Sequence, residues 1–202
     1  MKKLFIILGG FCLTAFAEQT LLNDFLTNAK TMKANFTQTI VMGKKSRVTN
    51  GTMEISRPNK FRWTYIEDKQ LIVSDAKKVY IYDQPLQQVT VKKLDSSIDK
   101  SPAAVLAGAN NIQNLYKVSM ATTDNNDGLK WIKIEPKQAT ENNGFKIVLM
   151  GFDKKKNLAA MQFIDAFGNK SMLTFNDLHT GMPISDDEFN FKVPKGVDVV
   201  EQ

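Results

Sequence analysis

The sequence predicts an α+β protein that is mainly antiparallel β, with a large sheet and a few short helices. Three observations support this class: two blocks of short runs rich in β-branched and aromatic residues, turn residues between those runs, and one amphipathic helical pattern near the N-terminus. The chain has 202 residues, of which 43% are hydrophobic and 24% are charged. These values are typical of one globular domain and exclude a disordered, collagen-like or coiled-coil chain.

Residues 1–17 have the pattern of a secretory signal that is cleaved off. Two lysines precede the apolar run Leu4–Leu13, and the small-residue site Ala15-Phe16-Ala17 follows it. Cleavage would leave a single domain over residues 18–202, with a net charge of +4 and without the only cysteine, Cys12. We therefore expect a protein outside the cytoplasm that has no disulfide and no cysteine-based chemistry. Lipid attachment at Cys12 is the alternative, which the bulky residue before it disfavours.

One amphipathic helix is predicted over Thr20–Met32, where apolar residues recur at helical spacing with polar residues between them. Its apolar side chains are expected to face the sheet as part of a helical cover. The residues assigned to this face are Leu22, Phe25, Leu26 and Ala29.

Two blocks of strands follow this helix. The first block is predicted to contain Phe36–Met42, Arg47–Ile55, Phe61–Ile66, Gln70–Ser74, Lys78–Tyr82 and Gln87–Lys92. The second block is predicted to contain Tyr116–Thr122, Lys130–Pro136, Phe145–Gly151, Asn157–Asp165 and Ser171–Asp177. The dipeptides Asp127-Gly128, Asn143-Gly144 and Gly168-Asn169 are typical of hairpin turns and indicate consecutive antiparallel strands.

Two further segments break the strand pattern. Between the blocks, Pro102–Ala107 has the composition of a short helix, with Ser101 as its expected N-cap and proline at the first helical position. After the last strand, Ser185–Phe191 predicts a short helical turn, and residues 193–199 predict an extended tail.

About eleven consecutive antiparallel strands make a sheet that cannot stay flat, because strand twist accumulates across it. If such a sheet curls into a barrel of more than about eight strands, its own side chains no longer fill the interior. The two helical segments would then cover the concave face and leave an apolar pocket for a lipid-like ligand. The alternative, and the commoner outcome for this pattern, is a β-sandwich with a filled core.

The histidine, the acidic cluster and the lysine clusters of this sequence give little support for an enzyme, a metal site or a nucleic-acid-binding protein. His179 is the only histidine, and Asp186-Asp187-Glu188 fits the positive end of a short helix better than a calcium loop. The clusters Lys92-Lys93 and Lys154-Lys155-Lys156 fall at strand ends and turns, where lysines usually face water. We therefore expect no catalytic residues, no metal, no cofactor and no nucleic-acid partner.

Arg57 is unusual because it shares a strand face with Met53 and Ile55 by the two-residue period of a strand. If this face is the concave one, the guanidinium needs acceptors, and backbone carbonyls at the ends of the covering helices would suit its fixed donors. The alternative is that the strand ends before Pro58 and Arg57 reaches water.

Five sequence blocks, given below with their positions, resemble the LolA family, whose members are periplasmic carriers that move lipoproteins from the inner to the outer membrane of Gram-negative bacteria. The blocks are Asn35-Phe36-Thr37-Gln38, Ser56-Arg57-Pro58-Asn59-Lys60-Phe61-Arg62-Trp63, Ile72-Val73-Ser74-Asp75, Val79-Tyr80-Ile81-Tyr82-Asp83 and Phe189-Asn190-Phe191. The resemblance implies an incomplete, eleven-stranded β-barrel with an α-helical lid over an apolar concave face that receives acyl chains.

The resemblance also implies roles for particular residues. It makes Arg57 the lid latch and adds Ala103, Ala104, Val105 and Leu106 to the lid. The residues expected to line the acyl-chain cavity or its rim are Phe36, Met53, Ile55, Phe61, Trp63, Tyr80 and Tyr82.

The partners that the resemblance implies are acylated lipoproteins as cargo, an inner-membrane ABC transporter of the LolCDE type and an outer-membrane receptor of the LolB type. Because Cys12 is a poor lipid-attachment site, the chain resembles the carrier and not the lipid-anchored receptor. We expect a monomer in the periplasm. The alternatives are an extracytoplasmic sensor of lipids and a hydrolase with an enclosed site.

Overall fold

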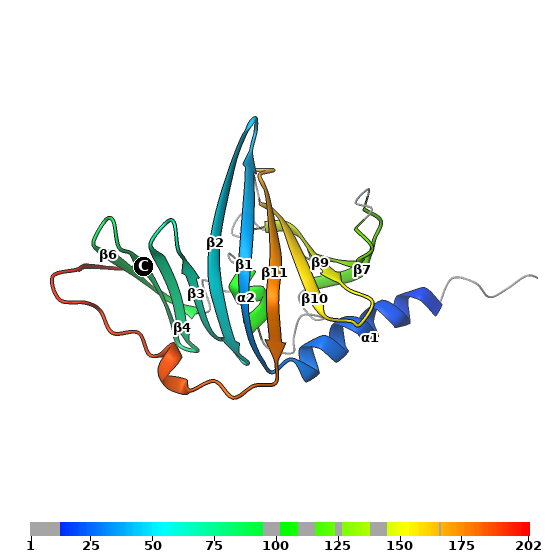
Figure 1. Ribbon diagram of the computed structural model, residues 1–202, viewed down its shortest axis with the longest axis horizontal. Coiled ribbons are helices and arrows are strands. Elements are labelled where there is room, and N and C mark those ends of the chain that lie inside the picture. The colour runs from blue at the N-terminus through cyan, green and yellow to red at the C-terminus, as the bar shows by residue number, and fades with distance from the viewer. Residues whose placement is uncertain (1–12, 95–101, 109–115, 124–126, 138–144, 166) are drawn as a thin grey trace, which may run out of the picture.

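A computed structural model of the protein describes residues 13–94, 102–108, 116–123, 127–137, 145–165 and 167–202, and the side chains from residue 20 onward except those of residues 102 and 104. The described residues form a single curved sheet with two α-helices on its concave side (Figure 1). The sheet has twelve strands in the order β12-β6-β5-β4-β3-β2-β1-β11-β10-β9-β8-β7, so its two edges do not meet. This unclosed arrangement confirms the predicted fold class and rules out the β-sandwich.

All eleven predicted strands are present, with ends that differ by a few residues. The first block consists of β1 (Thr31–Met42), β2 (Lys45–Ser56), β3 (Lys60–Tyr65), β4 (Gln70–Asp75), β5 (Lys78–Asp83) and β6 (Gln88–Lys93). The second block consists of β7 (Tyr116–Ala121), β8 (Lys130–Pro136), β9 (Phe145–Phe152), β10 (Leu158–Asp165) and β11 (Lys170–Thr180). The twelfth strand, β12 (Asp198–Glu201), lies in the predicted tail and pairs parallel to β6.

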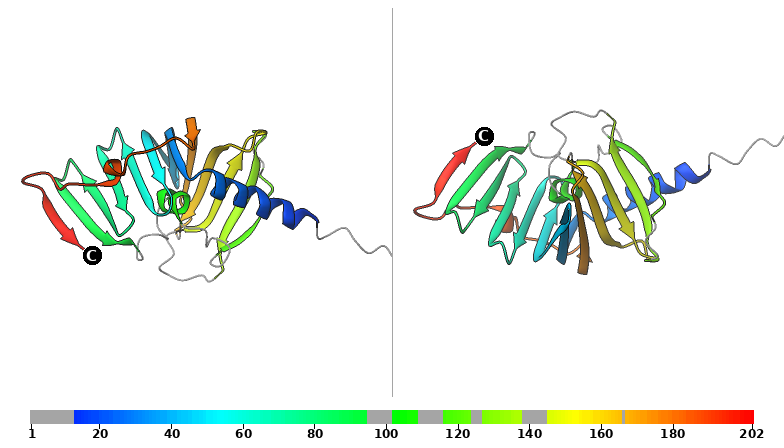
Figure 2. Two further views of the ribbon diagram at one scale, coloured as in Figure 1. Left: turned by 90° about the horizontal axis from the view of Figure 1, so that it is seen from below. Right: turned by 90° about the horizontal axis from the view of Figure 1, so that it is seen from above.

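The two strand blocks join through β1 and β11, which pair antiparallel along most of their length. The prediction of eleven strands in one consecutive series is therefore wrong at one step, because β6 and β7 follow each other in the sequence but lie far apart in the sheet. The helix α2 lies against β2 and β3, and α1 crosses the second block toward β7 (Figure 2). Each block then forms one wall of an open half-barrel.

The helices occupy nearly the predicted positions. The first, α1 (Leu13–Asn28), begins seven residues before the predicted start, within the predicted signal, and ends four residues earlier than predicted, because Thr31 and Met32 already belong to β1. The second, α2 (Pro102–Ala107), matches its prediction, whereas the expected N-cap Ser101 and residues 1–12 of the predicted signal lie outside the described residues. None of the helices in the described part of the chain is long and apolar enough to span a membrane.

The core lies between the concave face of the sheet and the two helices. Along β1, Met32, Ala34 and Phe36 alternate with exposed or half-buried residues and are at most 4% exposed. The same alternation in the other strands gives one continuous apolar cluster that includes residues of both helices. The concave face is therefore the apolar surface that the sequence predicts.

The opposite face of β3 to β6 is covered by the C-terminal strap, which we define as residues 181–197 (Figure 2). The short helical turn η3 (Asp186–Phe189) lies within it, and Ser185 is its N-cap. Phe189 is 1% exposed, and Lys60 Nζ lies 2.8 Å from a carboxylate oxygen of Asp186. The strap is thus bound to the convex side, away from the helices.

Candidate functional site

Five of the seven residues predicted to line the acyl-chain cavity lie together on the concave face. They come from three neighbouring strands, and each is at most 1% exposed. These residues are Phe36, Met53, Ile55, Phe61 and Trp63. The rings of Phe36 and Trp63 lie 4.8 Å apart between centroids, so aromatic side chains form the centre of this surface.

The two lid helices cover this surface with apolar side chains. In α1, Leu22, Phe25 and Leu26 are buried, and the Phe25 ring meets the ring of Phe152 in β9 edge-on at 5.4 Å. Ala29 is also buried, just after the end of α1. In α2, Ala103 and Leu106 are buried and Val105 is half-buried, while the side chain of Ala104 lies outside the described part.

Tyr80 and Tyr82 do not belong to this surface, so their predicted place in the cavity is wrong. Side chains in β5 alternate, and the residues that reach the apolar cluster are Val79 and Ile81. The tyrosine rings therefore point to the convex face, where their centroids lie 5.4 and 6.0 Å from that of Phe191 in the C-terminal strap.

Arg57 follows the last residue of β2 and contacts both lid helices. Its Nε donates a hydrogen bond to the carbonyl oxygen of Leu106 in α2 at 2.7 Å, and its Nη1 donates to that of Leu26 in α1 at 2.8 Å. The guanidinium carbon also lies 5.2 Å from the centroid of the Phe25 ring, within the range of a cation–π contact. These are the contacts expected if Arg57 faces the concave side.

The guanidinium of Arg57 is held in a largely apolar environment. Burial lowers the pKa of Arg57 from 12.5 to about 10, so the group stays protonated at neutral pH. Its Nη2 has no hydrogen-bond partner among the described residues. The charge therefore depends on carbonyl groups of the two helices, and displacement of either helix would remove a partner from it.

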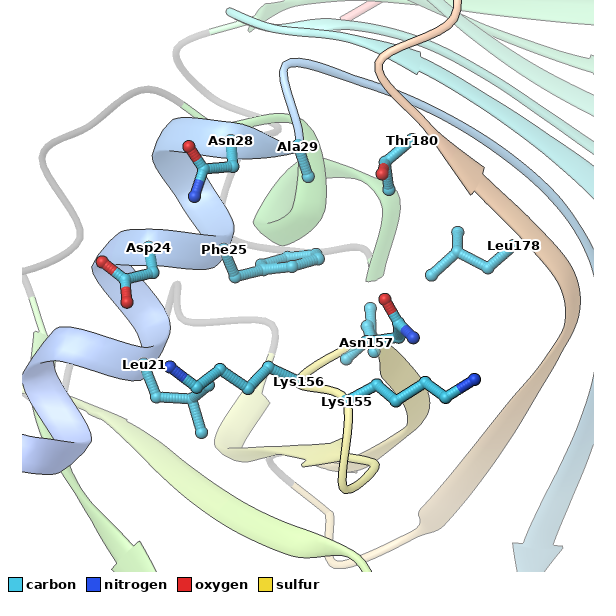
Figure 3. A pocket seen from close by; sticks show the side chains of 11 residues that line it. Leu21, Asp24, Phe25, Asn28, Ala29, Lys155, Lys156, Asn157, Leu178 and Thr180 are labelled. Atoms are coloured by element: carbon cyan, nitrogen blue, oxygen red, sulfur yellow. The ribbon is translucent and has the colours of Figure 1, made fainter.

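An opening lies beside α1, between this helix and the turn that joins β9 to β10 (Figure 3). We call it the α1 mouth; it encloses about 280 Å³. Its apolar lining comes from Leu21 and Phe25 in α1, Leu158 in β10 and Leu178 in β11. At its rim, the Lys156 side chain extends toward α1 and that of Lys155 toward β11 (Figure 3). The α1 mouth thus gives the apolar cluster a side opening.

A second opening lies at the end of the half-barrel opposite Arg57, next to the turn that joins β1 to β2. We call it the hairpin mouth; it encloses about 540 Å³. Its lining combines polar and apolar side chains and consists of Gln38, Ile40, Arg47, Thr49, Tyr65, Asp68, Gln70, Asp83, Pro85 and Leu86. Arg47 and Asp68 form an ion pair in this lining, and burial raises the pKa of Tyr65 to about 12.

Sequence reasoning missed both mouths. Leu158 lies in a predicted strand, and Leu178 lies one residue beyond the predicted end of another. Both line the α1 mouth only because α1 lies opposite them, and no pattern within the strands specifies the position of that helix. Gln38 and Thr49 could have been placed on the concave face by their two-residue spacing from Phe36 and Gly51.

The described residues contain no group of three or more side chains that could hold a metal ion. His179 is exposed near the end of β11, where it pairs with Lys33 of β1 in the register of the sheet. The arrangement that the structure brings together is therefore a buried apolar face, two covering helices and one arginine that joins them.

Comparison with known proteins agrees with this arrangement. The model of the family described as outer membrane lipoprotein carrier protein LolA matches residues 27–192. A relative from Cupriavidus taiwanensis named outer-membrane lipoprotein carrier protein is 40% identical over 187 residues, which cover 90% of this chain and 86% of the relative. A protein of the same name from Chromobacterium violaceum is 41% identical over 180 residues, with 89% and 85% covered.

Solved structures share the fold at low sequence identity. An uncharacterized conserved protein from Thermus thermophilus has a TM-score of 0.57 at 11% identity, over 93% of this chain and 99% of its own. A LolA superfamily protein from Nitrosomonas europaea has a TM-score of 0.50 at 10% identity, over 88% and 98%. These two likenesses support the unclosed sheet and say nothing about a ligand.

Proposed function

The chain belongs to the LolA family of outer membrane lipoprotein carrier proteins, and we propose that it carries lipoproteins by burying their acyl chains between the sheet and the two lid helices. The observation that carries this proposal is the link from Arg57 to both helices above a continuous apolar face. An apolar face covered by two short, tied segments suits a ligand that must be bound and later released.

The physical chemistry of the cargo makes such a carrier necessary. Burial of one methylene group contributes about 0.8 kcal/mol, so a 16-carbon acyl chain resists transfer into water by roughly 12 kcal/mol. A lipoprotein with three such chains resists by on the order of 30 kcal/mol or more. Spontaneous release from a membrane would be far too slow, and a protein surface must replace the lipid around the chains.

The residues proposed to contact the acyl chains are those of the central aromatic and aliphatic surface. Phe36, Phe61 and Trp63 supply large flat surfaces, and Met53 supplies an adaptable side chain that can follow ligands of different shape. We propose that cargo displaces Leu22, Phe25, Leu26, Ala29, Ala103, Val105 and Leu106 from this surface.

The family resemblance supplies the direction of transport in this proposal. Cargo would come from an inner-membrane ABC transporter of the LolCDE type and would pass to an outer-membrane receptor of the LolB type, in the periplasm. The predicted signal over residues 1–17 fits export to that compartment. The carrier would act as a monomer without catalytic residues, metal or cofactor.

The test measures cargo binding by the mature protein directly. Lipid-modified lipoprotein in detergent micelles would be mixed with the carrier, the detergent removed, and soluble carrier–cargo complex separated by size. We expect soluble complex with acylated lipoprotein and none with the same polypeptide lacking its acyl chains. A Trp63→Asp variant should lose the complex, whereas a Tyr82→Asp variant, changed on the convex face, should keep it. Equal complex formation by acylated and unacylated polypeptide would refute the proposal.

A further inference from the structure

The concave face becomes more polar along its length. On β1, the inward residues run from Met32 and Phe36 to Gln38 and Ile40, and on β3 they run from Phe61 and Trp63 to Tyr65, so polar groups join the apolar ones at this end. The neighbouring strands follow the same order: at their hairpin-mouth ends the inward residues are Thr49, Gln70 and Asp83. The face thus has one apolar end and one end that also offers polar groups.

The two ends also differ in what covers them. Arg57 and the ends of both lid helices close the apolar end, because Arg57 Nε and Nη1 bind carbonyl oxygens of Leu106 and Leu26. Among the described side chains of the two helices, none lines the hairpin mouth. A ligand that spans the face therefore meets an apolar end that the helices cover and an end that also offers polar groups.

Gln38 gives the hairpin mouth a specific polar feature. The residue is only 6% exposed, and its Nε2 donates to the Ser171 hydroxyl at 2.5 Å. Its Oε1 is buried and has no hydrogen-bond partner among the described residues, although Gln38 lines the hairpin mouth. A buried acceptor without a donor is costly, and a ligand that brings a donor would recover that cost.

An acylated lipoprotein has the same polarity order as this face. Its acyl chains are apolar, and they meet the polypeptide at a junction that contains amide N–H groups and ester carbonyls. Burial of such polar groups without partners is costly, so the junction favours the end of the face where hydrogen-bonding groups are available. The α1 mouth also has polar lining residues, but the buried acceptor without a partner, Gln38 Oε1, belongs to a residue that lines the hairpin mouth.

We infer that the hairpin mouth binds the junction between acyl chains and polypeptide of the cargo, and that Gln38 Oε1 accepts a hydrogen bond from an amide N–H of this junction. This inference rests on the proposed function. It adds the orientation of the cargo: acyl chains point toward Arg57, and the polypeptide leaves the carrier beside the turn between β5 and β6, where Leu86 lies.

The orientation can be tested with a synthetic triacylated cysteine lipopeptide that carries one photoreactive group. In one version the group is at the end of an acyl chain, and in the other it is at the residue after the cysteine. We expect the acyl probe to label Ile55 or Phe61, near Arg57, and the peptide probe to label Ile40 or Leu86. Labelling of Asn28 or Lys156 by the peptide probe would overturn the inferred orientation and leave the proposed function intact. Failure of the acyl probe to label the concave face would refute the proposed function itself.

The role of Gln38 can be tested with two variants. Gln38→Leu removes the unpartnered acceptor, so we expect the lipopeptide to bind about three- to tenfold more weakly, while the empty protein keeps its thermal midpoint. Ser171→Ala breaks the hydrogen bond from Gln38 Nε2 but leaves Oε1 in place, and it should bind the lipopeptide as the native protein does. Equal affinity of Gln38→Leu and the native protein would overturn the assignment of Gln38.

Discussion

Replacement of Arg57 by leucine tests whether this residue holds the lid closed. The change removes the hydrogen bonds to Leu106 and Leu26, which are 2.7 and 2.8 Å long. Hydrogen bonds from charged groups contribute about 1.5 to 3 kcal/mol each, and the burial that lowers the pKa of Arg57 to about 10 favours the lower end of that range. The latch is therefore worth about 3 kcal/mol, or a roughly hundredfold factor in an equilibrium constant.

This energy should appear in cargo release, because the latch forms again when the helices return to the sheet. We expect Arg57→Leu to retain bound lipopeptide up to about a hundredfold more tightly and to deliver lipoprotein more slowly to receptor-bearing vesicles. The assay follows transfer of a fluorescent lipoprotein from loaded carrier to the vesicles. Arg57→Lys should resemble the leucine variant, since one ammonium group cannot reproduce the two fixed donors.

Arg62→Leu is the matched control for loss of an arginine. Arg62 lies on β3 and donates through Nη1 to the carbonyl of Glu188 in the C-terminal strap at 3.2 Å, so it does not contact the helices. This control should deliver cargo at the native rate. Native retention and delivery by Arg57→Leu would refute the latch and the energy assigned to it.

Three further predictions concern stability. In Gly51→Ala, the new Cβ would lie 2.0 Å from a backbone oxygen of β3 and 2.4 Å from the Phe36 ring. We expect the free energy of unfolding, measured by calorimetry, to fall by about 2 to 4 kcal/mol. An unchanged thermal midpoint would contradict this prediction. Hydrogen bonds from Asn50 lower the pKa of Glu67 from 4.5 to about 2. The ionised Glu67 side chain therefore stabilises the folded protein above pH 4.5, and this stabilisation is lost as the pH falls toward 2. The difference in urea midpoint between the native protein and Glu67→Gln should shrink over this range, and a constant difference would argue against the prediction. Phe189→Ala removes the buried ring of the C-terminal strap, at about 3 to 5 kcal/mol, and should make the strap sensitive to protease before the sheet is cut; native resistance of the strap would count against this.

Local patterns were enough to place most of the fold. Alternation of apolar and polar residues located all eleven antiparallel strands, and proline at the first helical position located α2. The pairing of β1 with β11 could not be read from any one strand, because it depends on how two distant blocks pack. The strand β12 was predicted as a tail because a single edge pairing with β6 leaves its four residues exposed and without the usual alternation.

The alternation of side chains in a strand led to correct site residues in β2 and to incorrect ones in β5. It placed Met53, Ile55 and Arg57 on one face, and the apolar neighbours showed which face this was. In β5 the tyrosines and the aliphatic residues are both large and partly apolar, so polarity did not identify the inward side. The C-terminal strap covers the tyrosines, and no pattern within β5 indicates a segment more than a hundred residues away.

The closed lid explains how one surface can both bind and release an acyl chain. Leu22, Phe25, Leu26 and Leu106 cover the concave face in the empty protein, and burial of such side chains contributes about 1.5 to 3 kcal/mol each. Together they contribute roughly 6 to 12 kcal/mol, close to the roughly 12 kcal/mol of one 16-carbon chain. The helices therefore act as an internal substitute for one acyl chain. A cargo with several chains outweighs them and opens the lid, and departure of the cargo is favoured by return of the helices and by the two Arg57 hydrogen bonds, so the carrier needs no other source of energy to close.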